Sequence, residues 1–305
     1  MERFSVIGFV GLGTMGLPMA ANFVKAGLEV RGFDVDKDAE AAFRERGGTA
    51  GFGSAAEACR GVDAAFTSLP NTQHVQAALA GIDGVLSVLE PGSYVVDVST
   101  ISPTATKELA EQAQEHDVSF ADAPVSGSSI GAETATLTMM VGASGSVFSE
   151  LQPLLQVLGS NIFHVGDVGA GESIKLINNL LVAINTAALA EAYAIASKTS
   201  IEPQVLYDVV SKSTGDSWVW RNRIPVKGIV PGSPVENDFS PGFAASLLRK
   251  DLDLAREFAG ELGTPILLGS LVRELLSSVM AQGWGGKDYS ILTKFYDLVG
   301  KHESE

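Results

Sequence analysis

The sequence predicts an α/β protein in two parts: a parallel sheet flanked by helices, then an all-helical second half. Short apolar strands alternate with helical segments as far as residue 166. A proline-free apolar stretch, 169–197, then has the length of one helix of about 40 Å. Beyond residue 197 we find no strand pattern. We therefore expect two domains, 1–166 and 167–305, with the long helix joining them.

Composition limits the kind of partner. The chain has 305 residues, 46% of them hydrophobic, and a formal net charge of -15. A surface this acidic argues against binding nucleic acid or an anionic membrane, because both need clustered positive charge. The single cysteine, Cys59, allows no disulfide within the chain, and the four histidines show no metal-ligand spacing. We expect a cytoplasmic protein without a structural or catalytic metal.

The first 34 residues carry a dinucleotide-binding pattern. An apolar strand, 4–10, leads into a glycine-rich turn, a helix and a second strand, 29–33, that ends at Asp34. In this strand–turn–helix order the glycines allow a tight turn and close approach of the backbone to a pyrophosphate. The free N–H groups of the helix then face the phosphates. The residues of this turn are Gly11, Leu12, Gly13, Thr14, Met15 and Gly16.

Asp34 sets the expected cofactor. It follows Gly16 by 18 residues, where a carboxylate can accept a hydrogen bond from the ribose 2′-hydroxyl. The same carboxylate would repel a 2′-phosphate. The pattern therefore favours NAD over NADP on a Rossmann domain.

Further strands place side chains at the same edge of the sheet. Strands at 64–69 and 94–98 end beside Leu69-Pro70 and Thr100. Ligands on parallel sheets lie outside the carboxyl ends of the strands. After a strand at 118–121 comes a loop of small and hydroxylated residues, 122–129, whose backbone N–H groups are suited to a carboxylate. Ordinary turn chemistry explains each of these segments equally well.

The long helix has polar side chains where it begins. It is apolar almost all round from 180 to 190, and we expect such a helix to be buried on every side. Lys175 and Asn179 are four residues apart and share one face. A lysine that opens a buried helix is unusual for packing, so we expect this turn to hold the chemistry.

The second half predicts helices at 203–212, 243–262, 265–282 and 289–300. Between them, 215–223 carries two tryptophans and two arginines, and 229–241 is rich in proline. Lys250 lies on an apolar stripe of its helix, where it either has a function or reaches out to solvent.

Four segments together resemble the β-hydroxyacid dehydrogenase family. They are GFVGLGTMGLPMAANF near the start, DAPVSG at 122–127, GAGESIKLINN at 169–179 and RKD at 249–251. The resemblance extends through GWGGKDYS at 283–290. It implies a Rossmann domain joined by a long interdomain helix to an all-α C-terminal domain, commonly assembled as homodimers or homotetramers.

The resemblance implies roles for the substrate-facing residues. Lys175 matches the family's catalytic lysine, and Asn179 its neighbour in the active site. Ser126 and Gly127 match the loop that binds the substrate carboxylate. Ser128 stands where the family usually has a second glycine, which leaves the identity of the acid open.

The resemblance also implies cofactor contacts. Thr100 and Lys250 match residues that contact the cofactor, and Leu69 and Pro70 match the pair that flanks the nicotinamide. NADP-using members usually carry Asn-Arg after the second strand, where this chain has Asp34-Val35. The departure again favours NAD.

The expected activity is NAD-dependent oxidation of a small 3-hydroxy acid, of the 3-hydroxyisobutyrate or L-threonate type, with Lys175 as acid/base. One alternative is an NADPH-linked semialdehyde reductase on the same fold. Another is a nucleotide-binding scaffold without catalysis. A 6-phosphogluconate-type decarboxylase needs a larger helical domain, and imine reductases typically lack the lysine.

Overall fold

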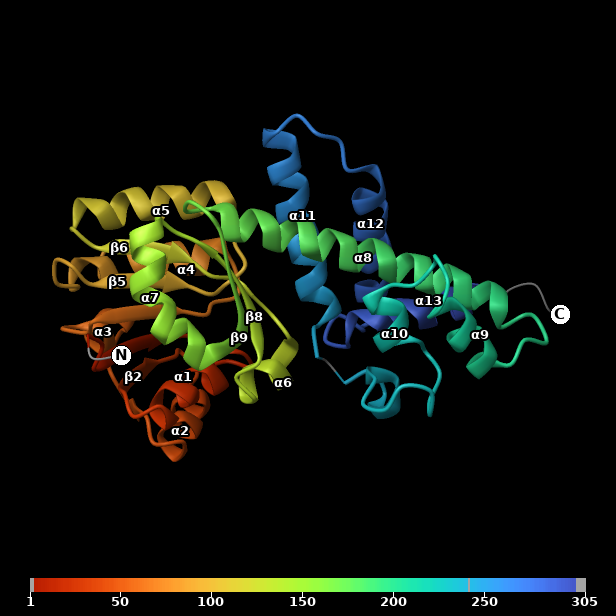
Figure 1. Cartoon of the computed structure of the whole chain (residues 1–305), viewed down its shortest axis with the longest axis horizontal. Coiled ribbons are helices and arrows are strands. Elements are labelled where there is room, and N and C mark those ends of the chain that lie inside the picture. Colours follow the sequence, from red (N-terminus) through yellow and green to blue (C-terminus); the bar gives the residue numbers. More distant parts are fainter. Residues whose placement is uncertain (1–2, 241, 300–305) are drawn as a thin grey trace. The chain divides into compact units, whose positions relative to one another are not determined.

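The computed structural model describes residues 3–240 and 242–299 (Figure 1). Contacts divide the chain into two compact units between Lys175 and Leu176. The predicted domain boundary at residue 166 stays a prediction, because a division by contacts does not show which segment folds independently.

The first unit is built on a mostly parallel sheet, in which the strand order is β3-β2-β1-β4-β5-β6-β8-β7, with β9 also paired to β8. Strands β1 to β6 run parallel, whereas β8 is antiparallel to both β6 and β7. The order reverses at β1, which lies between β2 and β4, and nucleotides bind outside such a switch point. The strands are β1 (Val6–Val10), β2 (Glu29–Phe33), β3 (Thr49–Ala50), β4 (Ala64–Thr67), β5 (Tyr94–Asp97), β6 (Ser119–Asp122), β7 (Val125–Ser126), β8 (Leu137–Gly142) and β9 (Gly159–Gly166).

Two apolar cores cover the two faces of this sheet. Successive residues of a strand point to opposite faces and so belong to different cores. Phe66 and Val96 lie in the first core, and their neighbours Ala65 and Val95 lie in the second. Helices α1 (Gly16–Lys25), α2 (Lys37–Glu45) and α7 (Gly145–Leu158) supply the first core. Helices α3 (Ala55–Cys59), α4 (Thr72–Ala80) and α5 (Pro103–Glu115) supply the second, with the 3-10 turn η1 (Val85–Ser87). The α/β prediction is confirmed.

The segment predicted as a loop at 122–129 has more structure than expected. It contains β7 and the start of a short helix, α6 (Ser128–Glu133). Strand β7 is only two residues long and pairs with β8, Ser126 lying opposite Thr138. So short a strand has no alternating pattern of its own, which is why the sequence did not reveal it.

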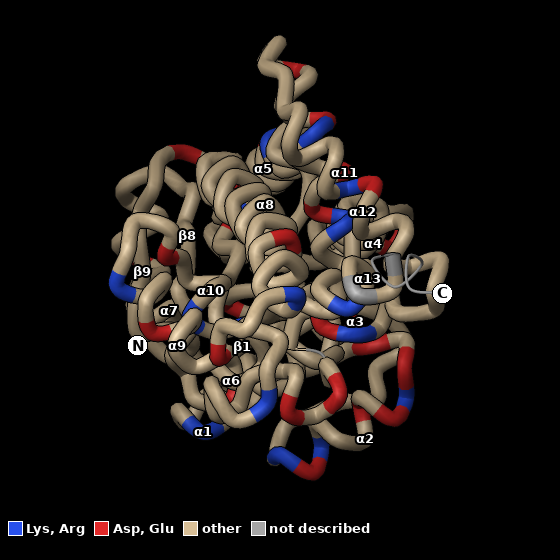
Figure 2. Tube along the Cα trace, turned by 90° about the vertical axis from the view of Figure 1, so that its right-hand side faces the viewer, with Lys and Arg blue, Asp and Glu red and all other residues tan. Residues whose placement is uncertain are grey.

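Helix α8 (Ala170–Ala196) confirms the long helix but not its burial on every side. Ala183, Ala187 and Ala190 pack in the core of the second unit. On other sides Ile177, Leu181 and Ile195 are 51%, 56% and 70% exposed. An apolar composition does not guarantee burial in a single chain, because another protein surface can cover the rest. Figure 2 shows α8 as a tube with few charged residues along it.

Length and hydropathy alone would also let α8 cross a membrane, and within residues 3–240 and 242–299 it is the one helix of which this is true. Core helices of soluble proteins pass the same test. Its alanines contribute to a protein core. The length of α8 therefore does not by itself indicate a membrane.

The second unit is helical in its described residues, as predicted. A main core joins α8 to α11, α12 and the segment 289–292, and a smaller core forms around Trp220. The elements after α8 are α9 (Pro203–Val210), α10 (Trp218–Arg223), η2 (Pro234–Asn237), α11 (Ala245–Glu261), α12 (Leu267–Ala281), η3 (Tyr289–Ile291) and α13 (Leu292–Val299).

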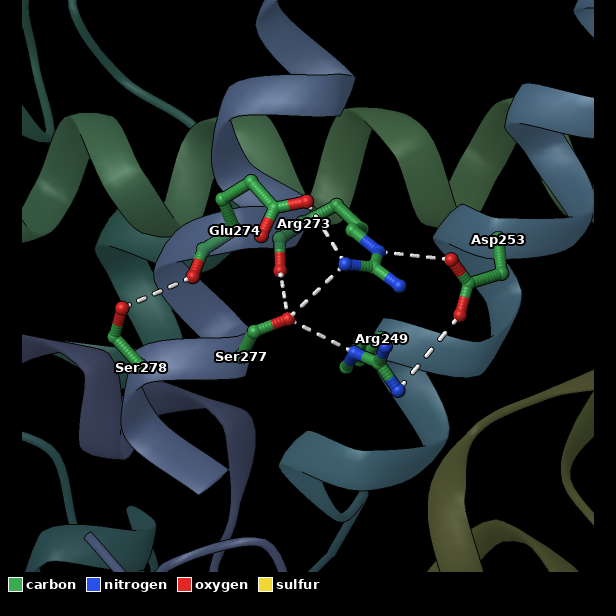
Figure 3. A network of polar contacts seen from close by, with 6 residues as sticks. All are labelled: Arg249, Asp253, Arg273, Glu274, Ser277 and Ser278. Carbon is green, nitrogen blue, oxygen red and sulfur yellow. Dashed lines mark hydrogen bonds and ion pairs between the residues drawn. The ribbon is translucent and has the colours of Figure 1, made fainter. Parts of the chain in front are cut away.

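Polar side chains fix α11 against α12 (Figure 3). Arg273 of α12 donates to Asp253 of α11 at 2.8 Å, and Arg249 of α11 donates to Ser277 of α12 at 3.0 Å. Arg249 also lies 3.8 Å from Asp253. Several charges in one group hold a relative position better than an isolated surface pair does. The network therefore sets the position of α11, which carries Lys250 and Asp251.

Candidate active site

The glycine-rich turn has the geometry that phosphate binding needs. Gly11 has φ +95°, and a Cβ there would lie 2.2 Å from the carbonyl oxygen of Ser68. A Cβ on Gly16 would lie 1.8 Å from the carbonyl oxygen of Gly11. A Cβ on Gly13, in contrast, would meet nothing within 4 Å. Gly11 and Gly16 are thus required by the protein's own packing, while Gly13 leaves its backbone open to a ligand.

The helix that follows can face an anion. Met15 precedes α1, and its side chain makes no capping hydrogen bond to the helix. The Leu17 N–H donates to the carbonyl of Gly13 at 3.0 Å, and Pro18 has no N–H. The start of α1 therefore offers an anion the positive end of the helix dipole, next to the backbone of the turn. Together with the open backbone at Gly13, this fits the pyrophosphate of a dinucleotide.

Asp34 lies where β2 ends and faces the turn. Its Oδ2 accepts a hydrogen bond of 2.6 Å from the N–H of Leu12, and its Oδ1 accepts one of 2.8 Å from Asp36. A carboxylate has about four acceptor positions, so acceptor capacity remains for a ribose hydroxyl. The carboxylate is half-buried beside the turn, a position that opposes a second negative charge.

The next two strand ends are joined to each other. The N–H of Leu69 donates to Ser99 Oγ at 2.9 Å, and Thr67 Oγ1 donates to buried Asp97 at 2.7 Å. Thr100 follows Ser99 and is half-buried, and Pro70 is exposed. The structure therefore brings the glycine turn, Asp34, Leu69, Pro70 and Thr100 to one edge of the sheet, at the carboxyl ends of β1, β2, β4 and β5.

The segment 126–128 has an unusual backbone. Gly127 has φ +138° and Ser128 has φ +60°. Both values lie where residues with a Cβ are disfavoured, and the cost for a serine is about 1–2 kcal/mol. The conformation explains why a glycine is the usual residue at position 128 in the family that the sequence resembles. Ser126 and Ser128 are half-buried, and Gly127 is exposed.

Lys175 lies in the second turn of α8 and is 8% exposed. The start of this helix is held by Asp122, the last residue of β6. Asp122 Oδ1 accepts from the N–H of Gly169 at 2.7 Å and Oδ2 accepts from the N–H of Glu172 at 2.9 Å. Burial raises the pKa of Asp122 to about 6, against the opposing effect of these two hydrogen bonds.

Asn179 and Lys250 belong to the second unit, where one carboxylate connects them. Asn179 lies one turn after Lys175 in α8. Its amide donates to Asp251 Oδ2 at 2.6 Å, and Lys250 Nζ lies 3.0 Å from Asp251 Oδ1. Asn179 and Asp251 are each 2% exposed, and about a quarter of the Lys250 side chain is exposed. A half-buried lysine agrees with the apolar stripe predicted for it.

Two buried acidic residues, one in each unit, were not singled out from the sequence. Asp122 and Asp251 stand inside the segments DAPVSG and RKD that carried the family resemblance. Both are buried and hydrogen-bonded to residues that lie 47 and 72 positions away in the chain. No local pattern reveals such partners.

Comparison with known proteins assigns both halves of the chain. Residues 6–166 match the NAD binding domain of 6-phosphogluconate dehydrogenase. Residues 169–296 match a model described as NAD-binding of NADP-dependent 3-hydroxyisobutyrate dehydrogenase. The 2-(hydroxymethyl)glutarate dehydrogenase of Eubacterium barkeri is 40% identical, over 98% of this chain and 97% of its own length.

The chain belongs to the β-hydroxyacid dehydrogenase family. The NAD-dependent L-serine dehydrogenase of Pseudomonas aeruginosa is 37% identical, over 95% of this chain and 97% of its own. A solved structure of Mycobacterium tuberculosis 3-hydroxyisobutyrate dehydrogenase with L-serine superposes with a TM-score of 0.89 at 37% identity, covering 96% of this chain and 99% of that one. This family member is therefore an oxidoreductase with a nicotinamide-dinucleotide domain, and both the predicted family and the predicted fold class are confirmed.

Proposed function

We propose that this family member oxidises a small 3-hydroxy carboxylic acid to the corresponding semialdehyde or keto acid, with NAD as acceptor. The observation that carries the proposal is Lys175, a nearly buried amine one helical turn before Asn179 on α8. Relatives of similar length act on such substrates by name: 2-(hydroxymethyl)glutarate, L-serine and 3-hydroxyisobutyrate.

Each residue has a part in the proposed reaction. Bound NAD supplies the carbon that receives the hydride. Lys175 Nζ, in its neutral form, takes the proton of the substrate hydroxyl as the carbonyl forms, and returns it in the reverse reaction. Asn179 orients the lysine or the substrate, and Asp251 holds the Asn179 amide. Ser126 and the N–H groups of 127–128 hold the carboxylate, which fixes the reacting carbon.

The cofactor contacts follow the geometry of the first unit. The turn 11–16 binds the pyrophosphate, and Asp34 binds the ribose 2′-hydroxyl, which favours NAD over NADP. Leu69, Pro70 and Thr100 contact the cofactor at the carboxyl edge of the sheet. Lys250 is proposed as a further cofactor contact on the family resemblance.

We also propose a homodimer or homotetramer. Among the large apolar side chains of the second unit that are exposed in the single chain, six lie on α8 and α12, and monomeric proteins rarely leave large apolar patches uncovered. They are Ile177, Leu181, Ile195, Leu267, Leu268 and Leu271. Sedimentation of the wild type and of Leu268→Glu tests this: the variant is expected to dissociate.

A cytoplasmic location is also inferred, supported by the single buried thiol of Cys59.

Initial rates of NADH formation test the activity. The substrates are 3-hydroxyisobutyrate, L-threonate, D-glycerate, L-serine and 3-hydroxypropionate, each with NAD and with NADP. We expect a strong rate with NAD on at least one acid. A rate confined to NADPH and a semialdehyde would support the reductase alternative. Tight NAD binding with no turnover in either direction would support a non-catalytic scaffold.

A further inference from the structure

Asp122 holds the helix of the proposed catalytic lysine at two points. Its two oxygens accept hydrogen bonds from different N–H groups, those of Gly169 and Glu172. These donors flank the first turn of α8, three to six residues before Lys175. A carboxylate that bonds both ends of one turn fixes the direction of the helix as well as its position.

The surrounding backbone is shaped to this carboxylate. A Cβ on Gly142 of β8 would lie 2.4 Å from Asp122 Oδ1, and a Cβ on Gly171 of α8 would lie 2.7 Å from Oδ2. Gly169 has φ +90°, which favours glycine. Gly171 is therefore required by the close approach of α8 to Asp122 and to the carbonyl oxygen of Met140, which would lie 2.2 Å from the same Cβ. Gly169 is required by its backbone conformation.

Asp122 also begins the segment that reaches Ser126. The N–H of Ala123 donates to the carbonyl of Asp97 at 2.7 Å, and the N–H of Met140 donates to the carbonyl of Pro124 at 3.1 Å. Backbone bonds to β5 and β8 thus hold the residues between Asp122 and Ser126. One residue connects the proposed carboxylate-binding loop to the helix of the lysine.

Burying a carboxylate costs free energy, because its charge loses contact with water. The presence of a carboxylate here therefore indicates that both of its acceptor oxygens are needed. Asp122 is fully buried, and it pairs across the sheet with Asp97 of β5, which is also buried. The charge of Asp97 contributes to the raised pKa of Asp122. Two further charged residues lie at the same turn of α8: Glu172 is buried within the turn, and the Lys107 side chain of α5 lies beside Gly169. A neutral amide would avoid the desolvation of a charge but would offer one acceptor instead of two.

We propose that Asp122 is a positioning residue for Lys175. Its carboxylate fixes the first turn of α8 to the end of β6 and so sets the distance between the lysine and the substrate held at Ser126. The proposal rests on the proposed function of Lys175. A displacement near 1 Å between reacting groups lowers turnover by about 100-fold.

The test compares Asp122→Asn with Asp63→Asn. Asp63 is a matched control, because its carboxylate also accepts hydrogen bonds from two backbone N–H groups, those of Ser5 and Val6 at 2.6 and 2.9 Å. It precedes β4 and therefore lies at the opposite, amino edge of the sheet. Three quantities are measured: kcat and KM for 3-hydroxyisobutyrate with NAD, NADH binding stoichiometry by fluorescence, and hydrogen–deuterium exchange of the amides at 169–175.

We expect Asp122→Asn to exchange faster at 169–175 and to lose kcat by about 10–100-fold per NADH-binding site, with KM changed less than about threefold. Asp63→Asn should exchange faster near residues 5 and 6 and keep its kcat. Equal kcat in the two variants, or lost kcat with unchanged exchange at 169–175, would overturn the proposal. If Asp122→Asn does not fold, Gly171→Ala serves, since the added Cβ would displace α8 from Asp122 and from the Met140 carbonyl while no polar side chain is removed. An unchanged kcat in that variant would also overturn the proposal.

The exchange measurement separates this inference from the activity. If the wild type forms no NADH from any hydroxy acid, the proposed function fails. Faster exchange at 169–175 in Asp122→Asn would then still show that Asp122 holds the helix. Unchanged exchange would refute the positioning role whatever the substrate.

Discussion

The side-chain amide of Asn179 donates a hydrogen bond of 2.6 Å to Oδ2 of Asp251, and both residues are buried. The bond joins the long helix α8 to α11, and the arginine network between α11 and α12 fixes the position of α11 (Figure 3). Asn179 is therefore held by the core of the helical unit, as a residue that orients a substrate or a lysine must be.

Replacement of Asp251 tests this hydrogen bond. In Asp251→Ala the Asn179 amide loses its partner, so kcat/KM should fall about 10-fold or more. Stability should fall by about 1–3 kcal/mol, the cost of an unsatisfied buried group. Glu257→Ala is the control, because Glu257 is an exposed carboxylate of the same helix and lies outside the arginine network. Comparable losses of kcat/KM in both variants would contradict a specific role for Asp251.

Asp34 should decide between the two nicotinamide cofactors. Asp34→Asn keeps an acceptor for the N–H of Leu12 but removes the negative charge. The preference for NAD over NADP should therefore drop by about 10–100-fold, equivalent to about 1.4–2.8 kcal/mol. Ratios of kcat/KM for NAD and NADP measure it, with Asp36→Asn as the control. An unchanged ratio would show that another residue excludes the 2′-phosphate.

Ser128 should be replaceable by glycine with a gain in stability. At φ +60° a serine is strained and a glycine is not, so Ser128→Gly should stabilise the protein by up to about 1 kcal/mol. Thermal unfolding measures this effect. The same variant reports on the substrate: a raised KM for L-threonate but not for 3-hydroxyisobutyrate would indicate that the Ser128 hydroxyl binds a substrate hydroxyl. A loss of stability would contradict the account of the backbone.

Much of the nucleotide-binding part was predictable because its signals are local. Gly11, Gly13, Gly16 and Asp34 lie within 24 residues, and each is needed for a backbone or charge reason that the sequence expresses directly. Asp122 and Asp251 were missed because their partners are distant in the chain. The prediction that α8 is buried on every side was wrong for the single chain. An apolar sequence shows which side chains of a helix favour burial, but it does not show which surface, if any, covers them.

The raised pKa of Asp122 should be visible in how the stability of the protein depends on pH. Because its pKa is raised from 3.8 to about 6, protons bind more tightly to the folded state than to the unfolded state. The stabilisation is complete below pH 3.8 and is lost as the pH rises through 6. Relative to Asp122→Asn, the wild type should therefore lose about 1.4 kcal/mol between pH 5 and pH 7. Denaturant midpoints at the two pH values measure the difference. A difference that stays constant or grows with pH would contradict the raised pKa.

The most direct test of the account is the turnover of Lys175→Ala. We expect kcat for NADH formation to fall by about 100- to 10,000-fold, because the proton acceptor is lost. The dissociation constant for NADH, measured by fluorescence, should change little, because the residues proposed to bind the cofactor are intact. A kcat within about threefold of the wild type, with normal NADH binding, would contradict the assignment of Lys175 as the acid/base.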